Sequence, residues 1–323
     1  MAELEPRRLI KFGNSSFIVS LPKEWIERNN LKKGDWIYLR ENEKNEMTLM
    51  PKETRHSAET EKKIEIDLTD KEYELFKREL TSAYINNYNL ITLKGKNLKQ
   101  NFSNIKEIIG PLTGLEILEQ NPKEVIVKDF LNIETISPKK VLRRLDNIIR
   151  AIFEDLESGI DGHSFKKSLF DEIMEEDKNV NKLYLLILKL TKMGLNNQEV
   201  MKLFEMTYDE LSTTQWLAMN IEHIGDDLKR ISRFLTKTNL SNKQKECMQT
   251  NMHLIEESFI NVMTAYHTKE LKGAREVLCR KQTVLKEIEK LCHIGNNVLI
   301  GNIAERLRMV NGNICNISKL IIY

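Results

Sequence analysis

The chain has 323 residues, of which 41% are hydrophobic and 30% charged, and its formal net charge is only +2. This length predicts about two or three domains with cores of their own. The 13 Gly and 6 Pro residues are too few for a collagen-like or mostly disordered chain. The charge averaged over the whole chain indicates neither a nucleic-acid nor an acidic partner, so charge has to be read segment by segment.

The sequence gives no sign of membrane insertion or export. No apolar run reaches the ~18–20 residues that span a bilayer. Residues 1–8 lack the basic and apolar regions of a signal peptide. No CxxC pair occurs among the four cysteines, which favours reduced thiols. We therefore expect a cytoplasmic protein that is not inserted in a membrane.

Short strands dominate the first 53 residues. Alternating or β-rich patterns predict strands over 7–12, 17–21, 36–40 and 47–51, with one helix over 23–29. A polar segment, 53–63, has the composition of a linker.

The next segment, 64–131, has an α/β pattern. Strands are predicted over 64–66, 90–93, 115–118 and 125–127, with helices over 69–86 and 98–109. This segment contains no glycine-rich loop that would bind phosphate, so it gives no evidence of a nucleotide site.

Residues 138–323 are helical almost throughout. Apolar spacing predicts six helices: from 138 to a break at 159–162, then 165–193, 208–237, 243–267, 271–292 and 297–321. The third and sixth helices carry similar stretches when Glu222 is placed over Glu305, which also places Ile231 over Ile314. We interpret this as duplication of a three-helix unit.

Residues 7–40 carry eight Lys or Arg against three acidic residues, a local excess of +5. Three blocks follow one another there: Phe12-Gly13-Asn14-Ser15, Val19-Ser20-Leu21-Pro22-Lys23 and Leu31-Lys32-Lys33-Gly34-Asp35. In this order and spacing they resemble the swapped-hairpin DNA-binding domain of the AbrB/MazE type. The resemblance implies that two chains interleave their hairpins into one β-barrel that faces double-stranded DNA.

The implied DNA contacts map onto one short list of residues: Arg7, Arg8, Lys11, Asn14 and Ser15. Cations near phosphates release condensed counterions, and Arg also reads guanine edges. The alternative is that these cations form a solvated face of a toxin-binding or purely dimerising module.

One copy of residues 7–53 has too few apolar positions to close a core. Two copies together offer enough, from Ile18, Leu21, Ile26, Leu31, Ile37, Leu39 and Leu49. We therefore expect a homodimer through this module.

A second motif, Glu222-His223-Ile224-Gly225-Asp226, lies in the third predicted helix. Its two carboxylates, at i and i+4, share one helix face, where they repel each other unless a cation lies between them. The alternative is a solvated face with Asp227 and Lys229 as neighbours. Residues 138–323 resemble the PhoU family, regulators of phosphate uptake built from two tandem three-helix bundles.

The PhoU resemblance implies a divalent or ferric metal ion held by Asp177, Glu222 and Asp226, with Glu176 nearby. In the second repeat, Met309 stands where an acid is expected, and Lys286 could pair with Glu305. We therefore expect metal binding only in the first repeat.

These observations predict a multidomain fold with an N-terminal swapped-hairpin β-barrel, a small α/β middle domain and an all-α half of two tandem three-helix bundles. The expected boundaries are 1–56, 64–131 and 138–323, the last divided into 138–238 and 241–323. The combination resembles archaeal-type fusions, which implies a transcriptional regulator of phosphate uptake, acting as a repressor and not as an enzyme.

Two other functions stay open at this point. One is an adaptor that negatively regulates a phosphate transporter, with the N-terminal module serving only dimerisation. The other, a di-metal oxidoreductase, needs Glu-x-x-His pairs from two helices, and Glu222 is followed directly by His223.

Overall fold

The structure is a computed structural model that describes residues 6–13, 16–41, 46–51, 61–96, 98–162, 165–294 and 298–323, apart from the side chain of Arg40. The chain divides into two compact units, unit 1 (1–60) and unit 2 (61–323). Within the described ranges, none of the helices combines the length and the apolar character needed to cross a membrane.

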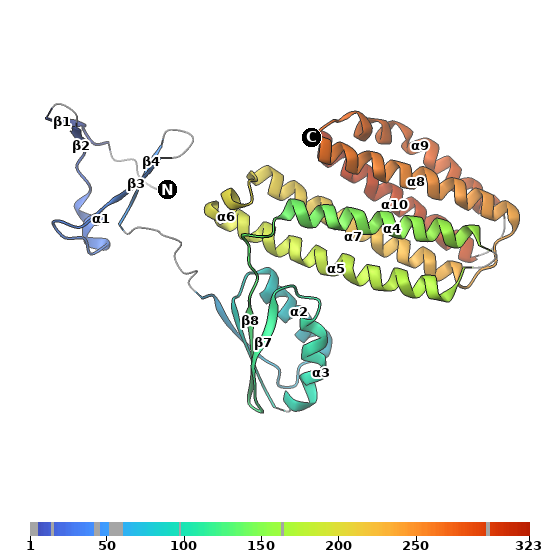
Figure 1. Cartoon of the computed structure of the whole chain (residues 1–323), viewed down its shortest axis with the longest axis horizontal. Coiled ribbons are helices and arrows are strands. Elements are labelled where there is room, and N and C mark those ends of the chain that lie inside the picture. The colour runs from blue at the N-terminus through green and yellow to red at the C-terminus, as the bar shows by residue number, and fades with distance from the viewer. Residues whose placement is uncertain are drawn as a thin grey trace. The chain divides into compact units, whose positions relative to one another are not determined.

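Unit 1 consists of two hairpins and a short helix (Figure 1). Its elements are β1 (Ile10–Phe12), β2 (Ser16–Ile18), α1 (Lys23–Arg28), β3 (Tyr38–Glu41) and β4 (Met47–Met50). β1 pairs antiparallel with β2, and β3 with β4. Gly13 follows β1 with φ +68°, a conformation that glycine adopts without strain. The predicted hairpins are confirmed, and most of the predicted linker over 53–63 lies outside the described residues.

The middle segment forms a four-stranded sheet with two helices packed on one face (Figure 1). Its elements are β5 (Lys63–Asp67), α2 (Tyr73–Ile85), β6 (Leu90–Lys94), α3 (Leu98–Ile109), β7 (Leu115–Gln120) and β8 (Glu124–Asp129). The strand order is β5-β6-β8-β7, with β5 and β6 parallel and the other pairs antiparallel. Alternate residues of β6 and β8 are buried, as expected for a sheet covered on one face. The predicted α/β region is confirmed.

The rest of unit 2 is helical, as predicted. Its elements are α4 (Pro138–Asp161), α5 (Lys167–Asn196), α6 (Gln198–Leu203), α7 (Tyr208–Leu235), α8 (Asn242–Thr268), α9 (Lys272–His293) and α10 (Val298–Ile322). The short helix α6 was not predicted. It begins where the side chain of Asn197 accepts hydrogen bonds from the amides of Glu199 and Val200. Capping boxes at Thr207 and Ser241 begin α7 and α8.

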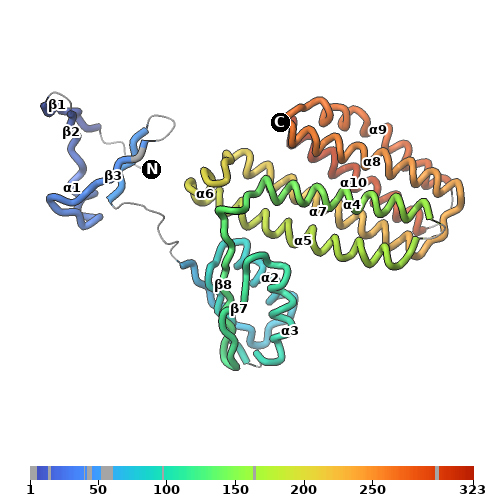
Figure 2. The backbone as a smooth tube through the Cα atoms, in the orientation of Figure 1, coloured from blue at the N-terminus to red at the C-terminus, as the bar shows by residue number. Residues whose placement is uncertain are grey.

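The long helices pack as two sets of three. Helices α4, α5 and α7 contact one another, and so do α8, α9 and α10. The sets meet where α7 lies against α10 and α4 against α8 (Figure 2). One apolar core runs through both sets. An ion pair also joins them, because Arg306 on α10 donates to Asp227 on α7 at 3.1 Å.

A buried ion pair joins the sheet to the helical sets. The ammonium of Lys189 on α5 lies 2.8 Å from a carboxylate oxygen of Asp129 at the end of β8, and Lys189 is 0% exposed. The same ammonium donates a hydrogen bond of 3.1 Å to the carbonyl of Tyr84 on α2. A charge buried in this way is tolerated only when it is paired and hydrogen-bonded. Helix α5 therefore belongs to the first set of helices and also packs against the middle α/β segment.

Candidate functional site

The basic residues predicted to face DNA lie at the start of unit 1. Arg7 and Arg8 precede β1, Lys11 is its central residue, and all three side chains are exposed. Asn14 and Ser15 fall outside the described residues.

The pairing of β1 with β2 separates the hairpin into two faces. Lys11 is opposite Phe17, whereas Ile10 is opposite Ile18. Because side chains alternate across a strand, Ile10 and Ile18 share one face and Lys11 lies on the other. The hairpin therefore has one aliphatic face, and on its other face Lys11 lies beside Phe17.

Unit 1 leaves its apolar side chains uncovered. None of its described residues, between 6 and 51, is buried. Large side chains that would form a core are instead exposed, including Trp36 at 81%. The others are Leu9, Ile10, Phe12, Phe17, Ile18, Val19, Leu39, Met47 and Leu49. A patch of this kind normally marks an interaction surface.

In the first set of helices, a glycine brings the predicted metal ligands together. A Cβ atom on Gly225 of α7 would lie 3.1 Å from Ile149 of α4 and 3.3 Å from Val180 of α5. The absence of a side chain lets the three helices approach closely at this point. Asp177 is almost one turn before Val180 on α5, and Asp226 follows Gly225 directly. Both carboxylates therefore lie at the same place between α5 and α7.

A lysine binds both of these carboxylates. The ammonium of Lys229 lies 2.7 Å from Asp177 Oδ2 and 2.6 Å from Asp226 Oδ1. Arg230 also donates to Asp226, at 3.1 Å. The third predicted ligand, Glu222, is half-buried on the same helix and has the exposed His223 ring 3.8 Å away. The alternative of a solvated face does not describe Lys229, whose side chain is only 16% exposed.

The electrostatics of this cluster reflect burial and crowding. Burial raises the pKa of Asp177, against the lowering effect of the Lys229 hydrogen bond. Burial also raises the pKa of Glu222, and the neighbouring Asp226 carboxylate adds to that shift. The two aspartates raise the pKa of Lys229 against the effect of its burial. The cluster is thus one coupled network with its cation built in.

The carboxylates of Asp177 and Asp226 can bind a cation, and here the ammonium of Lys229 takes that place. Lys229 and a metal ion compete for the same oxygens of Asp177 and Asp226. Asp177 Oδ1 remains buried, with no hydrogen-bond partner among the described residues. A metal ion in the first set therefore stays a prediction, and binding one through the bridged oxygens would require Lys229 to move.

The corresponding face of the second set is different. Glu305 on α10 is exposed and lies 3.4 Å from Arg308. Among the described residues it forms no ion pair with Lys286, the partner that the sequence made possible. Met309, which follows one turn later, is exposed. The acidic cluster of the first set thus has no counterpart at these positions.

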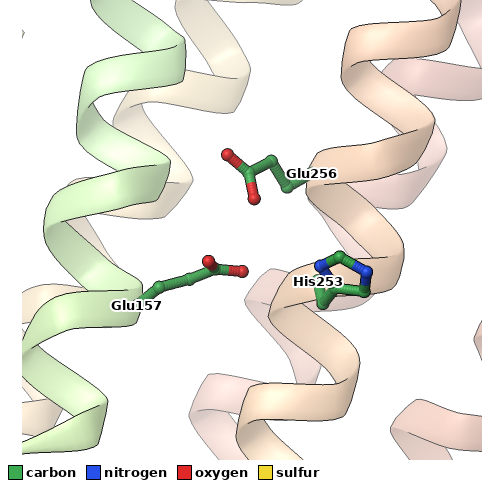
Figure 3. A group of neighbouring side chains, drawn as sticks. All are labelled: Glu157, His253 and Glu256. Carbon is green, nitrogen blue, oxygen red and sulfur yellow. The ribbon is translucent and has the colours of Figure 1, made fainter.

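A second polar group lies between the two sets, and sequence reasoning missed it. Glu157 of α4 and the His253 and Glu256 side chains of α8 place their ligand atoms within 4.8 Å of one another (Figure 3). Burial raises the pKa of Glu256, and the adjacent Glu157 carboxylate raises it further. Glu157 precedes the two α8 residues by about 100 positions in the sequence. Spacing along the chain therefore gives no signal of this group.

Comparison with known families gives two matches, one within unit 1 and one within unit 2. A model described as antidote-toxin recognition MazE, bacterial antitoxin, matches residues 10–55, and the PhoU domain model matches residues 140–235. The chain joins a MazE/AbrB-like domain to a PhoU domain. No curated protein and no solved structure matches it.

The two matches cover only part of the predicted sites. The PhoU match runs from the start of α4 to the end of α7, and so includes Asp177, Glu222 and Asp226. The MazE match includes Lys11, whereas Arg7 and Arg8 precede it. Both families are regulatory and non-catalytic.

Proposed function

We propose that this chain is a DNA-binding transcriptional regulator of phosphate uptake, acting as a repressor, with the PhoU domain as its sensor. The observation that carries the proposal is the two-faced β1–β2 hairpin, which has Lys11 on the face opposite Ile10 and Ile18. The MazE/AbrB-like match supports the DNA-binding part, and the PhoU match supports the link to phosphate.

The uncovered aliphatic residues of unit 1, Ile10 and Ile18 among them, support an assembly in which a second copy covers them. The aliphatic face of the hairpin would then be buried between copies, and the face with Lys11 would stay outside. The excess of +5 over residues 7–40 would be doubled in such a dimer. Each phosphate contact made by these cations releases counterions, so affinity for DNA should fall steeply with salt.

The test is binding of the full chain to a 30-base-pair double-stranded DNA at several salt concentrations. We expect Arg8→Ala with Lys11→Ala to weaken binding and to reduce the salt slope by about one unit for each lost phosphate contact. The matched control is Lys99→Ala with Lys123→Ala, which removes two exposed positive charges from unit 2. Unchanged affinity and slope in the first variant would contradict the assigned contacts.

The adaptor function is separated from this proposal by the same measurement. If the intact chain binds DNA no better than a control protein, the N-terminal module serves only dimerisation or recognition of a toxin, as the MazE description names. Regulation of a phosphate transporter through the PhoU domain would then be the better account.

A further inference from the structure

Helices α4 and α8 form an antiparallel seam between the two sets. Asp146 on α4 lies 3.0 Å from the His267 ring on α8. Further towards the C-terminal end of α4, which is further towards the N-terminal end of α8, the Phe153 and Phe259 rings lie 5.8 Å apart. Glu157 follows one turn later on α4. Along the seam, a carboxylate–imidazole hydrogen bond is thus followed by two aromatic rings and then by the carboxylate of Glu157.

Glu157 meets two side chains of α8 at this step. His253 and Glu256 are three residues apart, so they lie on the same face of α8. Figure 3 shows the Glu157 and Glu256 side chains extending from the two helices into the space between them, with His253 beside them. The ligand atoms of all three lie within 4.8 Å of one another.

The carboxylates in this group are not paired with a lysine or an arginine. Within the described part of the chain, neither Glu157 nor Glu256 forms an ion pair with lysine or arginine, unlike Asp177 and Asp226. Glu157 Oε1 is buried and has no hydrogen-bond partner there. Two adjacent carboxylates with an orphaned oxygen repel each other unless a proton or a cation lies between them.

We propose that Glu157, His253 and Glu256 bind one divalent transition-metal ion, with zinc as the best fit, and thereby fasten the two helical sets together. One imidazole nitrogen with carboxylate oxygens is a ligand set that suits zinc, whereas magnesium prefers oxygens alone. Ligands about 2.0–2.2 Å from zinc lie about 3–4 Å from one another. The ligand atoms of this group, all within 4.8 Å of one another, lie close to that spacing.

The experiment uses the full chain and zinc chloride, with calorimetric titration and thermal unfolding as readouts. We expect zinc to raise the melting temperature of the wild type. Glu157→Gln with Glu256→Gln should remove one bound zinc per chain and abolish that rise. His253→Gln should weaken zinc binding at least tenfold. Because glutamine removes the repulsion between the carboxylates, the double variant should unfold at no lower temperature than the wild type without metal.

Two controls fix the location of the site. Glu154→Gln changes an exposed neighbour on α4, and Glu222→Gln with Asp226→Asn changes the cluster of the first set. Both should retain the zinc. If zinc binds the wild type and the Glu157/Glu256 double variant equally, the pair shares a proton and the proposal is overturned. Equal binding of magnesium and zinc would overturn the role of His253.

Discussion

The ammonium of Lys189 lies 2.8 Å from Asp129, and both side chains are buried where the sheet of the middle segment meets helix α5. Removing one partner of a buried pair leaves the other charge without compensation. Lys189→Met should therefore lower the free energy of unfolding by about 3–5 kcal/mol, as measured by urea denaturation. Lys189→Met with Asp129→Asn should lose less than the sum of the single changes. Additive losses would mean that the two side chains do not interact.

Lys229 offers a test of the metal predicted in the first set of helices. Lys229→Met removes the cation shared by Asp177 and Asp226, which should cost about 1–3 kcal/mol in the absence of metal. The freed carboxylates should then bind magnesium, and added magnesium should restore the melting temperature.

Two further variants in the Lys229→Met background locate that effect. Glu222→Gln with Asp226→Asn should abolish the magnesium response, whereas Glu305→Gln should leave it untouched. A response lost with Glu305→Gln would place the site in the second set. If magnesium does not change the melting temperature of Lys229→Met, the prediction of a metal ion bound by these carboxylates is contradicted.

The oligomeric state tests the role of unit 1. Deleting residues 1–56 leaves a chain whose two apolar cores lie wholly within residues 61–323, so it should remain folded. We expect light scattering to give a dimer for the full chain and a monomer for the truncated one. If light scattering shows that the truncated chain is still a dimer, the copies contact each other through unit 2 instead.

Asp146 should make the stability of the bundle depend on pH. Its burial alone would raise the pKa, but the hydrogen bonds from His267 and Arg150 outweigh burial and hold the pKa below its usual value. A carboxylate with a lowered pKa stabilises the fold above the unfolded value of about 3.9, and this contribution is lost as pH falls through the folded value.

Asp146→Asn should accordingly cost about 1–3 kcal/mol at pH 7 and clearly less at pH 3, measured by urea denaturation. Glu154→Gln, an exposed change on the same helix, is the control and should have little effect at either pH. A cost that is equal at both pH values would mean that packing, rather than charge, explains the Asp146 effect.

The sequence predicted most elements because their signals are local. Alternation, helical spacing and helix breaks such as the one predicted at 159–162 act over a few residues. Helix α6 was missed because it has only six residues and no apolar periodicity to mark it. The EHIGD motif was placed correctly on a helix, and Gly225 explains in packing terms why no larger residue stands there.

The predictions that depended on partners across the fold were less complete. The pairing of Lys229 with Asp177 was not predicted, because this acceptor lies 52 positions earlier in the chain. Lys189 interrupts an apolar stripe, and only the sheet explains its burial. His253 has no local signal of a site in the sequence, because one of the two glutamates beside it, Glu157, belongs to another helix.

Helix α5 carries Asp177 in its first half and Lys189 in its second, twelve residues or about 18 Å further along. A helix is stiff over such a length, so a displacement at one of these residues is felt at the other. If the loss or gain of a cation at Asp177 slides α5 along its axis, the buried Lys189–Asp129 pair has to follow or break.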